Sequence, residues 1–259
     1  MTRFLNWLNP FRRAPKRDRE GHMTLLQHLD ELRMRVMRAM FGLMIGTAIG
    51  LTVATPVLKF LQEPYGREFT VLGPTGGVVA YFRIALLIGA ILSIPLITYQ
   101  LMMFIFPGLR DNEKRVLLSS LPAITGLFLV GVAFAWYVLI PPALGFLEGF
   151  EPTLFKPEWT ADLYLSFVSA LVFWMGVAFE MPLIFFVLAL MGVVETGVLI
   201  RHWRIAIVGA SIAAAIITPT VDPVNMALVM GPLLALYIIS VALVALGGRI
   251  HRARLPAPL

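Results

Sequence analysis

Residues Thr24–Arg38 read TLLQHLDELRMRVMR and lead directly into an uncharged apolar run, and this junction decides the fold. Apolar residues in this stretch recur at helical spacing, which predicts one apolar stripe on a helix. Glu31 lies four residues before Arg35, the order that favours an ion pair on a helix surface. We therefore expect an amphipathic helix that enters a bilayer and leaves the carboxylate of Glu31 near the membrane surface.

The composition is that of a membrane protein. Of the 259 residues, 59% are hydrophobic and 14% are charged, and the mean hydropathy is +0.84. A soluble domain does not need so apolar a surface, whereas lipid-facing helices do. The absence of cysteine excludes a disulfide framework and a thiolate metal site. The net charge of +6 does not indicate nucleic-acid binding, because the bases concentrate in the short segments between apolar runs.

Apolar stretches of about the length that crosses a bilayer predict an all-α, polytopic membrane protein with six transmembrane helices. We expect a flexible, basic N-terminal extension (1–23), a six-helix transmembrane domain (24–248) and a short tail (249–259). Pro141–Pro142 is expected to stop the third span. The expected spans are 39–58, 78–104, 116–140, 163–191, 205–221 and 224–247, of which the fifth is short.

One further pattern concerns helix packing in the first span. Gly42, Gly46 and Gly50 repeat at every fourth residue. Such a ridge of small residues allows a second helix to approach closely, although glycine is common in membrane helices.

The distribution of bases sets the orientation. An even number of spans places both termini on one side, and that side carries seventeen of the 21 Lys and Arg residues. Because bases are enriched in cytoplasmic loops, both termini are expected in the cytoplasm.

No catalytic or metal-binding arrangement is recognisable in the sequence. The four histidines are scattered without the close pairing of a metal site, and no glycine-rich loop follows a strand. The sequence therefore predicts neither an enzyme nor a cofactor.

Glu180 is the costliest residue in any span. A charge deep in a membrane helix costs roughly 2.5–3.5 kcal/mol, so such residues are usually functional. Pro182 follows it and frees a backbone carbonyl. The simpler interpretation is a buried acid hydrogen-bonded to a neighbouring helix. An alternative function is a proton-coupled small-solute transporter with Glu180 as its coupling carboxylate, although no internal repeat supports it.

Four separate motifs together resemble the TatC family of the twin-arginine protein translocase. His28-Leu-Asp-Glu-Leu-Arg-Met-Arg35 is similar to the signature that opens this family. The resemblance extends in matching order over about Thr24–Gly248. The other motifs are Tyr99-Gln with Phe104 and Pro107-Gly-Leu-x-x-x-Glu-Lys-Arg115, the span from Leu163 through Phe179-Glu-Met-Pro182, and the turn Thr218-Pro-Thr-Val-Asp222.

The resemblance implies a receptor in the cytoplasmic membrane that recognises signal peptides with paired arginines. It further implies assembly with single-span subunits of the TatA/TatB type, self-association, and export of folded proteins driven by the proton motive force. The positions that match the family's signal-peptide site are Glu31, Glu113, Arg33, Phe104 and Leu109. Positions matching outer or intramembrane sites are Pro64, Glu180 and Asp222.

The chemistry of arginine recognition agrees with this resemblance. A guanidinium meets a carboxylate through two parallel hydrogen bonds, whereas a lysine presents only a point charge. Glu31 and Glu113 each precede a span on the same side, and adjacent bases are expected to hold them in exposed, weak ion pairs worth about 0–1 kcal/mol. The simpler interpretation of Glu113 is an acid favoured by the start of its helix.

Overall fold

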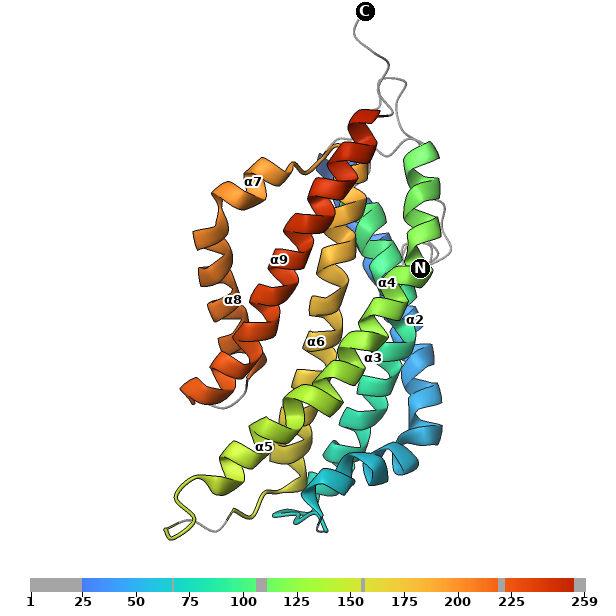
Figure 1. Ribbon diagram of the computed structural model, residues 1–259. Helices are drawn as coiled ribbons and strands as arrows, with labels where there is room; N and C mark the ends of the chain where they lie inside the picture. The colour runs from blue at the N-terminus through green and yellow to red at the C-terminus, as the bar shows by residue number, and fades with distance from the viewer. Residues whose placement is uncertain (1–24, 67, 106–110, 155–156, 219–221, 254–259) are drawn as a thin grey trace, which may run out of the picture. The chain divides into compact units, whose positions relative to one another are not determined.

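The computed structural model describes residues 25–66, 68–105, 111–154, 157–218 and 222–253. Most of these residues are helical, and they form no strand beyond an isolated bridge between Thr70 and Thr160 (Figure 1). They fall into two compact units. One unit ends at Ala54 and resumes over Ala85–Leu121, and the other comprises Thr55–Ile84 and the chain from Pro122 onward.

The first unit is built from parts of three helices, α2 (Leu25–Gln62), α3 (Gly76–Ile105) and α4 (Asp111–Phe134). Helix α2 continues without interruption from the amphipathic stretch into the apolar run. The expected junction between a surface helix and a membrane span is thus a single helix.

Glycines bring α2 and α3 together within the first unit. A Cβ atom on Gly46 would lie only 2.6 Å from the carbonyl oxygen of Gly89, and one on Gly50 would strike the backbone of Ala85. Ser93 Oγ donates a hydrogen bond to the Gly42 carbonyl at 2.9 Å. The predicted small-residue ridge is confirmed, and its partner is α3 in antiparallel register.

The second unit contains the remaining elements. Helix α6 (Ala161–Leu190) packs along α9 (Pro223–Ala253), and α9 also contacts α8 (Trp203–Ile217) and the short α7 (Thr196–Arg201) (Figure 1). Leu199 of α7 packs into a small core with Ala189 and Val244. A short 3₁₀ turn, η1 (Glu63–Tyr65), follows α2.

The prediction that Pro141–Pro142 ends the third span is wrong. After α4 the chain makes a π-helical turn, η2 (Ala135–Leu139), and continues as α5 (Ile140–Gly149). The prolines fall in the first turn of α5, where a missing N–H removes no helical hydrogen bond. The shift in hydrogen-bond register at η2 explains why this helix passes two prolines.

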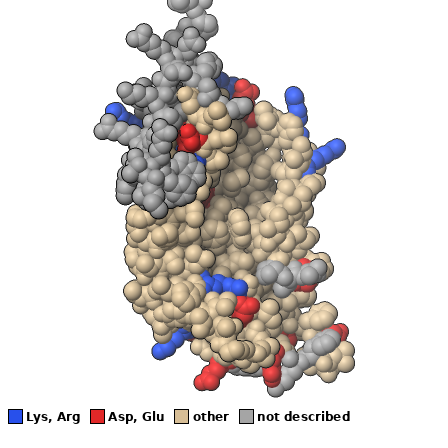
Figure 2. Space-filling model, turned by 180° about the vertical axis from the view of Figure 1, so that it is seen from behind, with Lys and Arg blue, Asp and Glu red and all other residues tan. Residues whose placement is uncertain are grey.

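Five of the described helical stretches are long and apolar enough to cross a membrane, and α8 is a shorter apolar helix. On the face drawn in Figure 2, charged side chains are few and most of the surface in view is uncharged. The chain is therefore a multi-pass membrane protein, as its composition predicts.

Candidate functional site

Near the N-terminus of α2, a buried ion pair joins Glu31 to Arg35. Arg35 Nε donates to Glu31 Oε1 at 2.9 Å, and Arg35 Nη2 forms a second short contact with the same oxygen. Arg35 Nη1 also donates to Gln100 Oε1 of α3 at 3.4 Å. The i,i+4 pair predicted from the sequence is confirmed, and it reaches a second helix.

The expectation that this pair is exposed is wrong. Glu31 is only 3% exposed, and Gln100, which accepts from its partner Arg35, is buried as well. The second carboxylate oxygen, Oε2, is buried and accepts no hydrogen bond within the described residues. A carboxylate with one engaged and one unused oxygen is a strong acceptor for a further charged donor.

An aromatic contact lies on the same two helices. The ring of His28 stacks on Phe104, with centroids 4.6 Å apart and an interplanar angle of 12°. The glycine contacts fix the antiparallel register of α2 and α3, and continuing it brings Arg35 to Gln100 and His28 to Phe104. Close helix packing in the span therefore positions the polar and aromatic side chains at its end.

Of the other residues predicted for this site, the structure describes Arg33 but neither the side chain of Glu113 nor Leu109. Arg33 lies on α2, half-buried, within two residues of the Glu31–Arg35 pair. Glu113 belongs to the first turn of α4, but its side chain lies outside the described residues, as does the whole of Leu109. The structure brings Glu31 and Arg35 together, and Phe104 lies nearby on α3. The contribution of Glu113 stays a prediction.

Gln100 is the residue of this site that sequence analysis missed. It stood in a family motif but carried no expected role. The sequence feature that could have indicated it is a side-chain amide at the end of an otherwise apolar span. If buried, such a group needs a hydrogen-bonding partner.

Pro64 lies exposed in η1, beside an aromatic cluster at the opposite end of α2. The neighbouring Tyr65 is buried, and its hydroxyl accepts from the backbone N–H of Trp159 at 3.2 Å. The Tyr164 hydroxyl donates to the Leu61 carbonyl at 2.8 Å. These contacts tie the loop after α2 to the start of α6.

A second set of contacts joins the same loops. Arg83 Nη1 donates to the backbone carbonyl of Asp162 at 2.7 Å and forms an ion pair with its carboxylate at 2.9 Å. The Ala161 N–H donates to the Thr70 carbonyl at 2.9 Å. Arg83 had no role expected from the sequence, although it is the one base inside the second expected span.

Asp222 caps the first turn of α9. Its Oδ1 accepts from the Asn225 backbone N–H at 2.7 Å, and its Oδ2 accepts from Asn225 Nδ2 at 3.0 Å. This arrangement satisfies a helix-start N–H that would otherwise lack a partner. The structure therefore gives Asp222 a local stabilising role.

Glu180 is buried within α6, at 4% exposure, and Pro182 one half-turn later is buried as well. The helix continues past Pro182 to Leu190. One turn of α6 therefore contains a buried acid and also a proline, which has no backbone N–H to donate. Burial of an ionisable group in this apolar helix is the feature that sequence analysis singled out.

Comparison with known protein families gives one match over most of the chain. The model of the Sec-independent protein translocase protein TatC matches residues 27–232. A TatC protein of Synechocystis sp. is 34% identical over 228 residues, which are 88% of this chain and 90% of the relative. A chloroplast TATC protein of Arabidopsis thaliana is 34% identical, over 89% of this chain and 68% of the relative.

A solved structure is also similar. A crystal structure of the twin-arginine translocase receptor TatC superposes with a TM-score of 0.75 at 36% identity. The superposition covers 85% of this chain and 99% of the crystal structure. Fold and sequence likeness therefore each extend over most of the chain.

Proposed function

Because the chain belongs to the TatC family of Sec-independent protein translocase proteins, we propose that it is the receptor subunit that recognises signal peptides with paired arginines. The single observation that carries this proposal is the buried Glu31 with its unused Oε2. An incoming guanidinium can donate to this oxygen and exchange with Arg35 at Oε1. The binding site is thus closed by an internal arginine until a ligand arginine replaces it.

Burial makes this exchange selective. Removing one partner from a buried ion pair is costly, about 3–5 kcal/mol, because the other charge is left unpaired. An arginine that displaces Arg35 restores two hydrogen bonds to the carboxylate, while a lysine restores one point contact. Discrimination between the two side chains follows from this difference.

The remaining site residues have supporting roles in the proposal. Glu113 supplies the carboxylate for the second arginine, Arg33 and Leu109 border the site, and Phe104 with His28 offers an aromatic surface to the peptide. Stacked rings accept a guanidinium face by cation–π attraction. A paired-arginine motif would then meet two acids and one aromatic surface.

The proposed topology has six spans in the cytoplasmic membrane with both termini in the cytoplasm. The six are α2, α3, α4 with α5, α6, α8 and α9. Helix α8 has 15 residues and measures about 22 Å, short of a hydrocarbon core of roughly 30 Å. Its packing on α9 and local thinning of the bilayer allow it to cross.

We propose further that the chain associates with single-span TatA/TatB-type subunits and with other copies of itself, and moves folded proteins outward on the proton motive force. The outer positions Pro64 and Asp222 and the intramembrane Glu180 are proposed as partner contacts. The hydrogen bonds of Tyr65 and Tyr164 support this, since they hold the turn that carries Pro64 against the start of α6.

Co-purification in membranes tests the receptor function. A tagged signal peptide with paired arginines should retain the chain, and a version with paired lysines should not. The proposal is contradicted if both peptides retain the chain equally, or if neither peptide retains it.

Glu180 supports a second candidate, a proton-coupled small-solute transporter, because it is a buried ionisable group in a span. A transporter with this coupling acid would bind neither peptide. It would instead lose solute uptake when Glu180 is replaced by Gln.

A further inference from the structure

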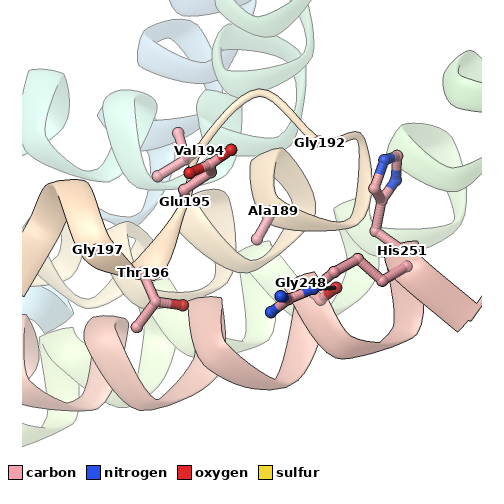
Figure 3. A pocket seen from close by; sticks show the side chains of 9 residues that line it. Ala189, Gly192, Val194, Glu195, Thr196, Gly197, Gly248 and His251 are labelled. Carbon is pink, nitrogen blue, oxygen red and sulfur yellow. Dashed lines mark hydrogen bonds between the residues drawn. The ribbon is translucent and has the colours of Figure 1, made fainter.

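A pocket of about 400 Å³ opens in the second unit, where the turn after α6, the start of α7 and the end of α9 meet (Figure 3). Its lining sets one base, Arg252, against one acid, Glu195. His251 Nδ1 donates to the Leu190 carbonyl at 2.9 Å and is thereby held at the wall. The two charges balance, so the lining of this pocket indicates no class of ligand.

In the first unit, Gln100 is a buried amide in contact with an arginine of the proposed binding site. It lies in the last two turns of α3, and its Oε1 accepts a hydrogen bond from Arg35 Nη1 at 3.4 Å. A guanidinium only donates, so this contact fixes the amide with its oxygen toward Arg35. Gln100 is thus an acceptor for Arg35 that carries no charge.

The guanidinium of Arg35 divides its hydrogen bonds between two helices. Nε and Nη2 face the carboxylate of Glu31 on α2, and Nη1 faces Gln100 on α3. The Arg35 side chain is only 12% exposed, so water cannot readily replace an acceptor that it loses. When a ligand guanidinium takes Glu31, Arg35 needs an acceptor nearby, and Gln100 is already in contact with it.

The packing of α2 on α3 places Gln100 opposite Arg35. Ser93 Oγ donates to the Gly42 carbonyl and marks the level at which the two helices touch. Arg35 lies seven residues before Gly42, and Gln100 lies seven residues after Ser93. Seven residues are about two helical turns, so in this antiparallel pair both side chains return to the facing sides at the same level. The contact between them therefore follows from the helix packing.

A neutral amide suits a site that must open and close. A carboxylate at position 100 would bind Arg35 as strongly as Glu31 does and draw it away, whereas an apolar side chain would leave a displaced Arg35 without this acceptor. With an amide, Arg35 stays on Glu31 in the absence of ligand and keeps one hydrogen bond when it is displaced. Gln100 therefore lowers the cost of displacement without opening the site by itself.

We propose that Gln100 is a positioning residue of the signal-peptide site, which retains Arg35 while a ligand arginine occupies Glu31. It acts through Arg35 and sets how readily Glu31 becomes free. A displaced Arg35 that is held on α3 also stays close enough to return to Glu31 when the ligand leaves. This inference rests on the receptor function proposed above.

The affinity of a paired-arginine peptide for the full chain in membranes tests this role. Gln100→Met keeps the side-chain length but removes the acceptor, and it should weaken binding by about three- to tenfold. Gln100→Glu offers Arg35 a carboxylate, and it should tighten binding by about the same factor. Disturbed packing would weaken binding in both variants, and that result would overturn the proposal.

Gln27→Glu is the matched control for the added charge. Gln27 lies one turn before Glu31 on α2 and two turns from Arg35, so an acid there brings the same charge near the site without reaching Arg35. It should tighten binding less than Gln100→Glu does. An equal gain would assign the effect to charge alone and overturn the proposal.

A double-mutant cycle with Arg35→Gln separates positioning from packing. In a chain without this guanidinium, Gln100→Met should change the affinity by less than about twofold, because no Arg35 is left to hold. Ser93→Ala is the control, since it removes another hydrogen bond between α2 and α3, and its effect should be the same in both backgrounds. Equal weakening by Gln100→Met with and without Arg35 would show that Gln100 only packs.

The same measurements keep this inference apart from the receptor function. If wild type shows no preference for the paired-arginine peptide over a paired-lysine peptide, the receptor function fails. If wild type shows that preference and both Gln100 variants bind as wild type does, the positioning role alone is overturned.

Discussion

Glu180 tests the account at the level of a single side chain. A group that accepts a hydrogen bond is needed at this buried position even if its charge is not, because an unmet partner in an apolar helix costs several kcal/mol. We expect Glu180→Gln and Glu180→Asp to export folded cargo near the wild-type level and Glu180→Leu to lose most export. Export is measured with a folded reporter, with the amount of chain in the membrane as the control. Wild-type export by Glu180→Leu would remove any role for this residue.

Substitutions at Asp222 test whether this residue stabilises α9 locally, apart from any contact with a partner. Loss of its two contacts to Asn225 in Asp222→Ala should lower the free energy of unfolding by about 0.5–2 kcal/mol, while Asp222→Asn keeps a capping oxygen and loses little. Thermal unfolding in detergent measures the difference. Equal melting temperatures for the Ala variant and wild type would show that the cap does not stabilise α9.

Contacts within one helix could be predicted from the sequence more easily than contacts between helices. The Glu31–Arg35 pair follows from four-residue spacing, which the backbone imposes. Gln100 lies 65 residues from Arg35, and only the packing of α2 on α3 brings the two side chains together. Burial of Glu31 was missed because spacing along one helix does not tell how much of a side chain the rest of the fold covers.

At the scale of elements, the glycine ridge on α2 should control the site at its end. A larger side chain at position 46 would strike the backbone of Gly89, and backbone cannot rotate away. Gly46→Leu should therefore destabilise the chain by about 1–3 kcal/mol and weaken peptide binding at Glu31.

Gly209→Leu is the control for this substitution, since a Cβ on this glycine of α8 meets no atom. It should leave stability and binding unchanged. If Gly46→Leu melts and binds as wild type does, the close approach of α2 and α3 does not position the site.

The elements themselves were largely predictable, because long apolar runs of suitable length leave few alternatives to membrane helices. The failure at Pro141–Pro142 has a local cause. Two prolines read as a stop in the sequence, whereas the π turn over Ala135–Leu139 moves them into the first turn of a new helix. Such a register shift leaves no pattern in hydrophobicity.

At the scale of the whole molecule, topology is the prediction to test. The chain has no cysteine, so single cysteines can be introduced and labelled from either side of the membrane. Cysteines after Arg115, Arg204 and Leu259 should react from the cytoplasm, and cysteines at Glu68, Glu158 and Asp222 from outside. An external C-terminus would contradict the six-span topology and the assignment of bases to the cytoplasm.

The central claim is that Glu31, together with Glu113, accepts a pair of arginines. Its most direct test is the affinity of paired-arginine and paired-lysine peptides for wild type, Glu31→Gln, Glu113→Gln and the double variant in membranes. Each substitution keeps the side-chain shape but removes charge-assisted hydrogen bonds worth roughly 1.5–3 kcal/mol. Paired-arginine binding should weaken by about ten- to a hundred-fold for each, non-additively in the double variant, with paired-lysine binding little changed. If Glu31→Gln keeps the full wild-type preference for arginine over lysine, the account is contradicted.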